Sequence, residues 1–201
     1  MNPPRISVVV PTFRRPELLR RCLLALCSQD LDPGDFEIVV ADDGPSPGTA
    51  RVVNAVRERP GSAGIRYVPV RLTQGPAGAR NLGWRAAQAP FIAFTDDDTI
   101  PRPGWLRAGL AALEAGADAA VGRTIVPVPD VPTDYERGVS GLERAEFITA
   151  NCFVRRLALE RTGGFDERYE KAWREDSDLQ FALLDRGFWT VSAPEAVVVH
   201  P

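Results

Sequence analysis

Short apolar runs alternate with longer amphipathic stretches over the first hundred residues of the chain. The runs cover residues 6–10, 36–41, 65–70 and 91–94 and are rich in Val, Ile and Phe. Runs of this length, bounded by Pro, Gly or Asp, are typical of buried strands. The stretches between them repeat apolar residues at helical spacing, as in the segment that follows Pro16. Alternating strands and helices predict an α/β fold with a doubly wound, largely parallel sheet.

The second half of the chain has a less regular pattern, although the same types of element are predicted. Pro69, within the third apolar run, indicates an irregular or edge strand. The further predicted elements are a helix from 103 to about 116, a strand at 119–122, a strand at 147–154, a short helix around 157–159, an acid-rich helix from 175 to about 187, and strands at 189–191 and 196–199. A proline-rich connection runs from Pro127 to about Gly141, and we expect mobility there.

Two clusters of carboxylates follow predicted strands. Asp42 and Asp43 end the second strand. A run of three acids, 96–98, ends the fourth. Because the carboxyl ends of parallel strands share one edge of the sheet, both clusters are expected where α/β proteins bind ligands. Adjacent carboxylates repel each other unless a cation lies among them, and Mg²⁺ or Mn²⁺ prefers such oxygen ligands. A solvated acidic turn is the alternative for one cluster, but two clusters on one edge favour a ligand site.

A segment of small residues, 74–81, precedes a predicted helix. Its Gly and Ala residues would let a ligand approach the backbone, and the start of a helix offers unpaired N–H groups to an anion. A tight turn at a helix start, without a ligand, is the alternative.

Composition limits the classes of function. The chain has 201 residues, of which 44% are hydrophobic and 25% charged, as expected for a single globular domain. The net charge of -3 argues against a nucleic-acid partner. No apolar run is long enough to cross a bilayer, and residues 1–5 lack the order of a signal peptide, so we expect a cytoplasmic location. Cys22, Cys27 and Cys152 have no metal-ligand spacing and are expected to be reduced thiols.

Six motifs follow one another along nearly the whole chain. They are SVVVPTF at 7–13, VADDG at 40–44, GARNLG at 78–83, FTDDD at 94–98, GGFDE at 163–167 and EDSDL at 175–179. With these motifs the chain resembles the nucleotide-diphospho-sugar glycosyltransferases of the GT-A fold, in particular glycosyltransferase family 2. The resemblance implies one GT-A (Rossmann-like) catalytic domain over residues 1–201, with a mostly parallel central mixed sheet flanked by helices. It also implies a nucleotide-binding half, 1–100, and an acceptor-binding half, 101–201.

The resemblance assigns the nucleotide sugar mainly to the first half. Pro11, Thr12 and Phe13 would line the nucleotide pocket. Asp43, or Asp42 beside it, would accept a hydrogen bond from the base or ribose, a task that suits an acceptor-only carboxylate. The full set expected at the nucleotide sugar is Pro11, Thr12, Phe13, Arg15, Asp42, Asp43, Gly78, Arg80, Asn81, Asp96 and Asp97. Arg80 would balance the carboxylates or reach the diphosphate, and a purely structural arginine is the alternative.

The resemblance also implies a divalent cation, Mn²⁺ or Mg²⁺. Asp96 and Asp98 match the two acids of the family's DxD motif, and both are assigned to the metal, with Asp98 as the more direct ligand and Asp96 nearer the ribose. Asp97 lies between them and either contacts the donor or points away. His200 is the only histidine and matches a metal ligand that follows the last strand in related enzymes. Neutral imidazole suits Mn²⁺, and a structural role is the alternative.

Asp176 matches the acid of the family's Glu-Asp motif, which implies the general base for the acceptor hydroxyl. Glu175 would orient the base or the acceptor. An acid that only caps the start of a helix is the alternative. The residues that resemble the family's acceptor-side elements are Asn151, Gly164, Phe165 and Asp166.

The activity that the resemblance implies is metal-dependent transfer of a sugar from a UDP-, GDP- or dTDP-sugar to an acceptor hydroxyl, with inversion. The acceptor would be a saccharide, a lipid-linked molecule or a small molecule, and peripheral membrane association stays open. A sugar nucleotidyltransferase is one alternative, but it would carry a glycine-rich loop where this chain has residues 11–15. A non-catalytic nucleotide-sugar-binding module is another. The presence of both Asp98 and Asp176 argues against it, because a binding module needs no base.

Overall fold

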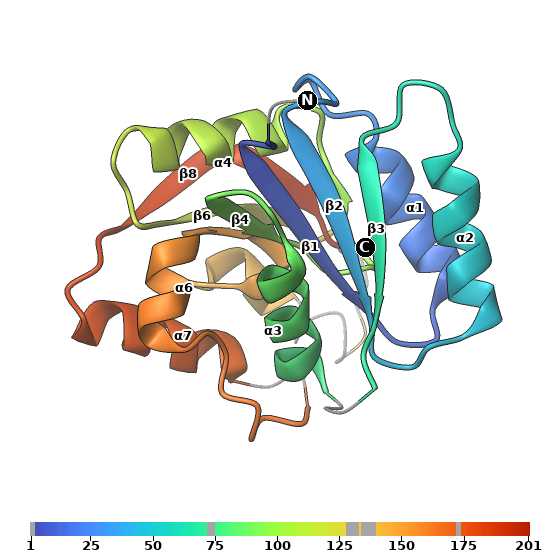
Figure 1. Ribbon diagram of the computed structural model, residues 1–201. Helices are drawn as coiled ribbons and strands as arrows, with labels where there is room; N and C mark the ends of the chain where they lie inside the picture. The colour runs from blue at the N-terminus through green and yellow to red at the C-terminus, as the bar shows by residue number, and fades with distance from the viewer. Residues whose placement is uncertain (1–2, 72–74, 128–132, 134–139, 172–173) are drawn as a thin grey trace.

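The computed structural model describes residues 3–71, 75–127, 133, 140–171 and 174–201. In this part of the chain, one α/β domain is built on an eight-stranded sheet in the order β3-β2-β1-β4-β7-β6-β8-β5 (Figure 1). The strands are β1 (Ile6–Thr12), β2 (Phe36–Asp42), β3 (Gly64–Pro69), β4 (Phe91–Phe94), β5 (Ile100–Pro101), β6 (Ala119–Ile125), β7 (Cys152–Arg155) and β8 (Thr190–Val199). The helices are α1 (Pro16–Leu26), α2 (Pro47–Arg57), α3 (Pro76–Ala86), α4 (Trp105–Glu114), α6 (Arg156–Thr162) and α7 (Glu175–Asp185), with short 3-10 helices η1 (Ser140–Arg144) and η2 (Thr149–Asn151).

Strands β3, β2, β1 and β4 are mutually parallel, as predicted from their alternation with helices. Thr12 of β1 is paired with Asp42 of β2, and Val9 is paired with Phe94 of β4. Because these strands run in one direction, the residues that follow them meet at one edge of the sheet. Strand β7 then pairs antiparallel with both β4 and β6, while β6 and β8 are parallel, so the sheet is mixed.

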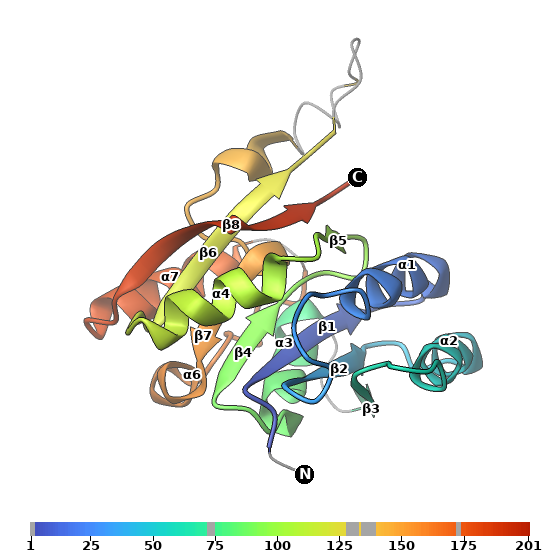
Figure 2. The ribbon, with the colours of Figure 1, turned by 90° about the horizontal axis from the view of Figure 1, so that it is seen from above.

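Helices cover both faces of the sheet (Figures 1 and 2). Val8 and Val10 of β1 join the core under α1, α2 and α4, whereas Val9 joins the core under α3, α6 and α7. All seven residues of β1 and of β2 are buried. Burial on both faces explains why these strands appear in the sequence as continuous apolar runs.

The second half of the sheet differs from the prediction in two places. Residues 147–154 were expected to form one strand, but the strand begins only at Cys152, because residues 149–151 form η2. The Asn151 side chain there donates hydrogen bonds to the Arg123 and Ala196 carbonyls. This segment is therefore held by side-chain hydrogen bonds and not by backbone pairing within the sheet. The two strands expected at 189–191 and 196–199 are one strand, β8, which crosses a register shift against β6.

In the small-residue segment expected to precede a helix, residues 76–81 already belong to the helix. Helix α3 begins at Pro76, so Gly78 to Asn81 lie in its first turns. Gly75 is its N-cap with φ of 112°, a conformation that glycine adopts without steric cost, and Pro76 provides the preset φ of a first helical position. An added Cβ at Gly75 would also meet the Glu170 carbonyl oxygen at 2.8 Å.

The proline-rich connection expected at 127–141 falls mostly outside the described residues. All three cysteines are free thiols, as predicted. Within the described ranges, none of the helices combines the length and the hydropathy that crossing a lipid bilayer would require.

Candidate active site

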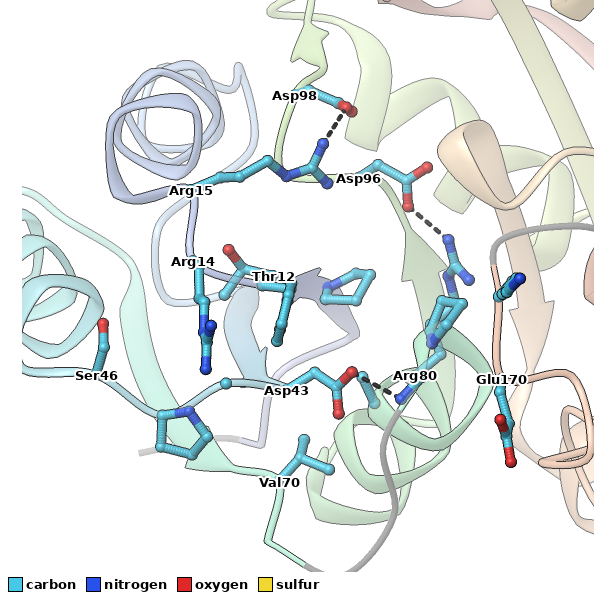
Figure 3. Close-up of a pocket in the computed structure, with 18 of the residues that line it drawn as sticks. Thr12, Arg14, Arg15, Asp43, Ser46, Val70, Arg80, Asp96, Asp98 and Glu170 are labelled. Carbon is cyan, nitrogen blue, oxygen red and sulfur yellow. Dashed lines mark hydrogen bonds and ion pairs between the residues drawn. The ribbon is translucent and has the colours of Figure 1, made fainter.

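A cavity of about 1580 Å³ opens at the carboxyl ends of the parallel strands (Figure 3). Its described lining is Pro11, Thr12, Phe13, Arg14, Arg15, Asp43, Gly44, Pro45, Ser46, Val70, Arg71, Gly75, Pro76, Ala79, Arg80, Asp96, Asp98, Leu142, Glu167, Glu170, Lys171 and His200. Residues of the predicted nucleotide side therefore share the cavity with a smaller set from the second half of the chain.

Asp43 stands on one side of Thr12 in the cavity (Figure 3). Its Oδ2 accepts a hydrogen bond of 2.7 Å from the Gly75 backbone N–H, which ties the loop after β2 to the start of α3. Burial raises the pKa of Asp43, and this hydrogen bond partly offsets the effect. Phe13, 49% exposed, presents its ring at the same cavity, and the Arg14 guanidinium lies 5.1 Å from the ring centroid.

Asp42 is not part of the cavity lining, which corrects the expectation that either acid could face the nucleotide. Its side chain is fully buried. Oδ2 accepts a hydrogen bond from the Tyr67 hydroxyl at 2.8 Å, and Oδ1 accepts one from the Gly44 N–H at 3.1 Å. Because Asp42 is still a strand residue, its side chain follows the alternation of β2, whereas Asp43 has left the strand.

Asp97 is likewise turned away from the cavity, which corrects its assignment to the donor. It is fully buried, and its Oδ2 accepts a 2.6 Å hydrogen bond from the Thr12 hydroxyl. Arg15 Nη2 lies 2.6 Å from Oδ1 as an ion pair. Burial raises the pKa of Asp97 to about 6, even though Thr12 and Arg15 act in the opposite direction. Asp97 thus anchors the acidic loop to the end of β1.

Asp98 and His200 face each other across the cavity edge. Arg15 Nη1 holds Asp98 Oδ2 at 2.8 Å, while Asp98 Oδ1 lies 3.6 Å from His200 Nε2. Among the described residues, that Oδ1 is buried without a hydrogen-bond partner. His200 reaches this place because its backbone N–H is bonded to the Ile125 carbonyl at 2.8 Å, at the end of β8.

Asp98 and His200 supply some, but not all, of the ligand atoms that a divalent cation needs. A carboxylate oxygen without a partner, facing an imidazole nitrogen, supplies two ligand atoms of types that Mn²⁺ accepts. Within the described part of the chain, no group of three His, Cys, Asp or Glu side chains could hold a metal ion. A cation here would therefore need oxygens from a bound phosphate and from water, as is common for Mg²⁺.

Arg80 projects from α3 and is 3% exposed. Its Nη2 pairs with Asp96 Oδ1 at 2.7 Å, and its Nη1 pairs with Glu175 Oε1 at 2.9 Å. Burial alone would lower the pKa of Arg80, but the two carboxylates outweigh it and the pKa is raised. Of the two roles expected for Arg80, these contacts favour balancing the carboxylates.

Gly78 and Asn81, both expected at the nucleotide sugar, are buried in α3 and are not part of the cavity lining. The Asn81 amide nitrogen donates to the Phe165 carbonyl and to Glu167, both at 2.8 Å. Its oxygen accepts from the Phe165 N–H at 2.9 Å. Asn81 therefore fastens the GGFDE turn to α3, which is a structural role.

The four residues expected on the acceptor side also lie outside the cavity lining. Asn151 is fully buried and accepts a 2.8 Å hydrogen bond from the Trp105 indole. Gly164, with φ of 80°, packs on Asn81, where an added Cβ would lie 2.4 Å from the amide oxygen. Phe165 is buried in the core, and Asp166 is paired with Arg168.

Five described residues from the second half of the chain line the cavity: Leu142, Glu167, Glu170, Lys171 and His200. His200 was predicted, whereas the other four were not among the expected site residues. Glu167 belongs to a recognised motif, and Lys171 is the only lysine of an arginine-rich chain. Leu142 and Glu170 carried no signal of their own.

Asp176 and Glu175 form the first turn of α7, as predicted, but neither lines the cavity. Glu175 is 3% exposed because its carboxylate is turned to Arg80, and burial raises its pKa. Asp176 Oδ1 accepts a 2.7 Å hydrogen bond from the Ser177 N–H. Glu175 is nevertheless connected to the cavity, because its ion-pair partner Arg80 lines it.

A family model, "Glycosyl transferase family 2", matches residues 7–168. Among curated proteins, a "Validoxylamine A glucosyltransferase" from Streptomyces hygroscopicus subsp. limoneus is 41% identical over 238 residues, which cover 95% of this chain and 52% of that protein. A "GalNAc(5)-diNAcBac-PP-undecaprenol beta-1,3-glucosyltransferase" from Campylobacter jejuni is 38% identical over 174 residues, covering 86% and 54%. The chain spans about half the length of these relatives.

Two solved structures are similar to this one in fold. The mannosyltransferase PcManGT from Pyrobaculum calidifontis, in complex with GDP-Man and Mn²⁺, superimposes with a TM-score of 0.75 at 24% identity, over 99% of this chain and 57% of that one. S. aureus TarS 1-349 in complex with UDP-GlcNAc gives 0.74 at 19% identity, over 97% and 58%. At these identities the likeness shows a shared fold.

Proposed function

The chain belongs to glycosyl transferase family 2 and has the GT-A fold, and from this premise we propose that it transfers a sugar from a nucleoside diphosphate sugar to an acceptor hydroxyl. The observation that carries the proposal is the cavity at the strand ends. It brings Asp43, Asp96, Asp98 and His200, which are far apart in the sequence, around one space. Ligands of α/β sheets bind at this edge.

The part of the cavity that residues 1–100 line suits the nucleotide. Phe13 offers an exposed aromatic face to a base, and Asp43 offers a carboxylate to a donor group of the base or ribose. Arg14, Arg71 and Lys171 also line the cavity and give it local positive charge, although the chain carries a net charge of -3. A negatively charged diphosphate is therefore attracted locally.

We assign the cation to Asp98 and His200. Mn²⁺ or Mg²⁺ bound there would neutralise charge that develops on the departing diphosphate. Asp98 and His200 would hold the cation, while Arg15, paired with the other oxygen of Asp98, fixes the orientation of that carboxylate. Relatives support this class of site, because the mannosyltransferase structure contains both GDP-Man and Mn²⁺.

Asp176 is the proposed general base, on the strength of the EDSDL motif. Direct attack of an acceptor hydroxyl on the anomeric carbon inverts that carbon and needs one base to take the hydroxyl proton. Asp176 lies in the first turn of α7, next to Glu175, which pairs with the cavity residue Arg80, and it would serve an acceptor that enters from that side. The names of the two relatives mention validoxylamine A and a PP-undecaprenol-linked saccharide, which supports a small-molecule or a lipid-linked acceptor. UDP, GDP and dTDP remain the candidate nucleotides.

The proposal is tested by binding and then by transfer. Thermal shift with UDP, GDP and dTDP, each with and without Mn²⁺, should select one nucleotide whose effect depends on the metal. Asp98→Asn should weaken metal-dependent binding of that nucleotide by about tenfold or more. Asp176→Asn should lower transfer by about a hundredfold or more while donor affinity stays within about threefold.

Asp185→Asn, an exposed acid at the other end of α7, is the matched control and should behave as wild type. If no nucleotide binds in a metal-dependent way, the proposed function is wrong. If Asp176→Asn transfers sugar at the normal rate, Asp176 is not the base.

A further inference from the structure

Arg80 connects three segments that are distant in the sequence. It projects from α3, pairs with Asp96 in the acidic loop after β4, and pairs with Glu175 in the first turn of α7. Figure 3 shows its guanidinium reaching Asp96 at the cavity edge. Donor-side and acceptor-side segments are thus joined through one side chain.

The burial of this cluster makes the contact strong and hard to replace. The side chain of Arg80 is 3% exposed and that of Glu175 is 5% exposed, so water screens their attraction weakly. The planar guanidinium presents its two terminal nitrogens in a fixed fork, with one carboxylate on each. A lysine ammonium is a single point on a flexible stem and does not reproduce this fork.

A direct contact to the diphosphate is disfavoured by charge. One guanidinium stands between two carboxylates, so the cluster as a whole is negative. An incoming diphosphate would meet that net negative charge, whereas Arg14, Arg71 and Lys171 line the same cavity without an ion pair of their own among the described contacts. Arg14, Arg71 and Lys171 are therefore better suited than Arg80 to bind the diphosphate.

Glu175 is the direct neighbour of Asp176 in the same helical turn. Because Glu175 is held by Arg80, the direction in which α7 starts, and with it the position of Asp176, depends on this ion pair. We propose that Arg80 is a positioning residue that fixes Asp176 relative to Asp96 through Glu175, so that donor loop and base keep one geometry. This inference rests on the proposed function.

A residue in this role affects turnover more than donor binding. The test compares Arg80→Met, Glu175→Met and the double variant, all close in size to the originals, in transfer kinetics and in donor calorimetry. Arg80→Met should lower kcat by about thirtyfold or more, with the donor Kd within about threefold of wild type. Glu175→Met should give a similar loss. The double variant should be no worse than about threefold below Arg80→Met, because both changes remove one interaction.

Arg80→Lys tests the fork itself and should keep kcat at least about tenfold below wild type, since one ammonium cannot hold both acids. Arg107→Met removes an exposed arginine of α4 that pairs with Asp30, and it should leave kcat unchanged. Unfolding midpoints show whether each variant is folded. If Arg80→Met does not fold, Arg80→Lys and Glu175→Met carry the test.

Three results would overturn the inference. A donor Kd that weakens in Arg80→Met as much as kcat falls would make Arg80 a donor contact. Multiplying effects in the double variant would show that the two residues act independently. If the wild-type protein is active and Arg80→Met or Glu175→Met has a normal kcat, the positioning role is wrong but the proposed function stands. If the wild-type protein is inactive with every donor, the proposed function itself is wrong.

Discussion

At the scale of single residues, the acidic loop shows how three adjacent carboxylates acquire different tasks. Asp96 pairs with buried Arg80, and Asp98 turns one oxygen towards His200. Asp97 points inwards to the Thr12 hydroxyl. The repulsion expected for three neighbouring acids is relieved by three different partners, and this separation leaves only Asp96 and Asp98 at the cavity.

Asp97 should make stability depend on pH in the metal-free protein. Its pKa rises from 3.8 to about 6, so the folded state holds the proton more tightly than the unfolded state. The protein is then stabilised below about pH 4, and this contribution is lost as the pH rises to about 6. The shift of about two units corresponds to roughly 3 kcal/mol.

The measurement is urea unfolding from pH 4 to 7 in EDTA for wild type and Asp97→Asn. The difference in unfolding free energy should move in favour of Asp97→Asn by up to about 3 kcal/mol across this range. Asp185→Asn reports the effect of removing one exposed acid from the surface. If the difference in unfolding free energy between the wild type and Asp97→Asn stays constant with pH, the cost assigned to burying the Asp97 carboxylate is wrong.

At the scale of elements, two helices lie so close to the sheet that glycine is needed at the contact. An added Cβ at Gly109 of α4 would lie 2.1 Å from the Phe153 ring, and one at Gly83 of α3 would lie 2.4 Å from Val9 Cγ1. By contrast, a Cβ at Gly48 of α2 would make only ordinary contacts, at 3.6 Å or more.

Gly109→Ala should therefore destabilise the protein, and Gly48→Ala should stabilise it. Alanine favours a helix over glycine by up to about 1 kcal/mol, and at Gly48 nothing opposes this gain. At Gly109 overpacking should exceed it and leave a net loss of about 1–3 kcal/mol. Thermal melting should show opposite shifts of about 2–4 °C per kcal/mol. Equal shifts in both variants would mean that α4 moves away from Phe153 at no cost.

The sequence predicts the elements whose burial determines their pattern. Strands β1, β2 and β4 are nearly fully buried, so their apolar runs are visible without tertiary information. The strand expected at 147–154 failed because Asn151 bonds to carbonyls of two distant segments, which local pattern cannot show. The join of two expected strands into β8 likewise depends on pairing with β6.

At the scale of the whole molecule, the cavity has one wall that the sequence predicts and one that it does not. Acid pairs after parallel strands must meet at one sheet edge, so the side with Asp43, Asp96 and Asp98 follows from strand order. The other wall comes from Leu142, in the short 3-10 helix η1, and from Glu167, Glu170 and Lys171, in the connection that precedes α7. Long-range packing, such as Gly75 on the Glu170 backbone, places that wall.

The size of the cavity predicts that two ligands bind side by side. Its volume of about 1580 Å³ exceeds the roughly 300–1,000 Å³ of an ordinary small-molecule site. A nucleoside diphosphate with Mn²⁺ should therefore cover residues 11–15 and 43–46 and leave 167–171 for the acceptor. At a ligand concentration of 100 Kd, amides that exchange only from the ligand-free state should slow by about a hundredfold.

Hydrogen exchange followed by mass spectrometry distinguishes the two walls. Peptides over 11–15 and 43–46 should be protected by the nucleotide that thermal shift selects, while a peptide over 167–171 should change only when an acceptor is added. The described cavity lining includes Ser46, the N-cap of α2, but no residue of the helix itself, so a peptide over 50–57 is the internal control. Protection of 167–171 by the nucleoside diphosphate alone would show that the nucleotide reaches across the cavity, and the division into a nucleotide half and an acceptor half would then be wrong.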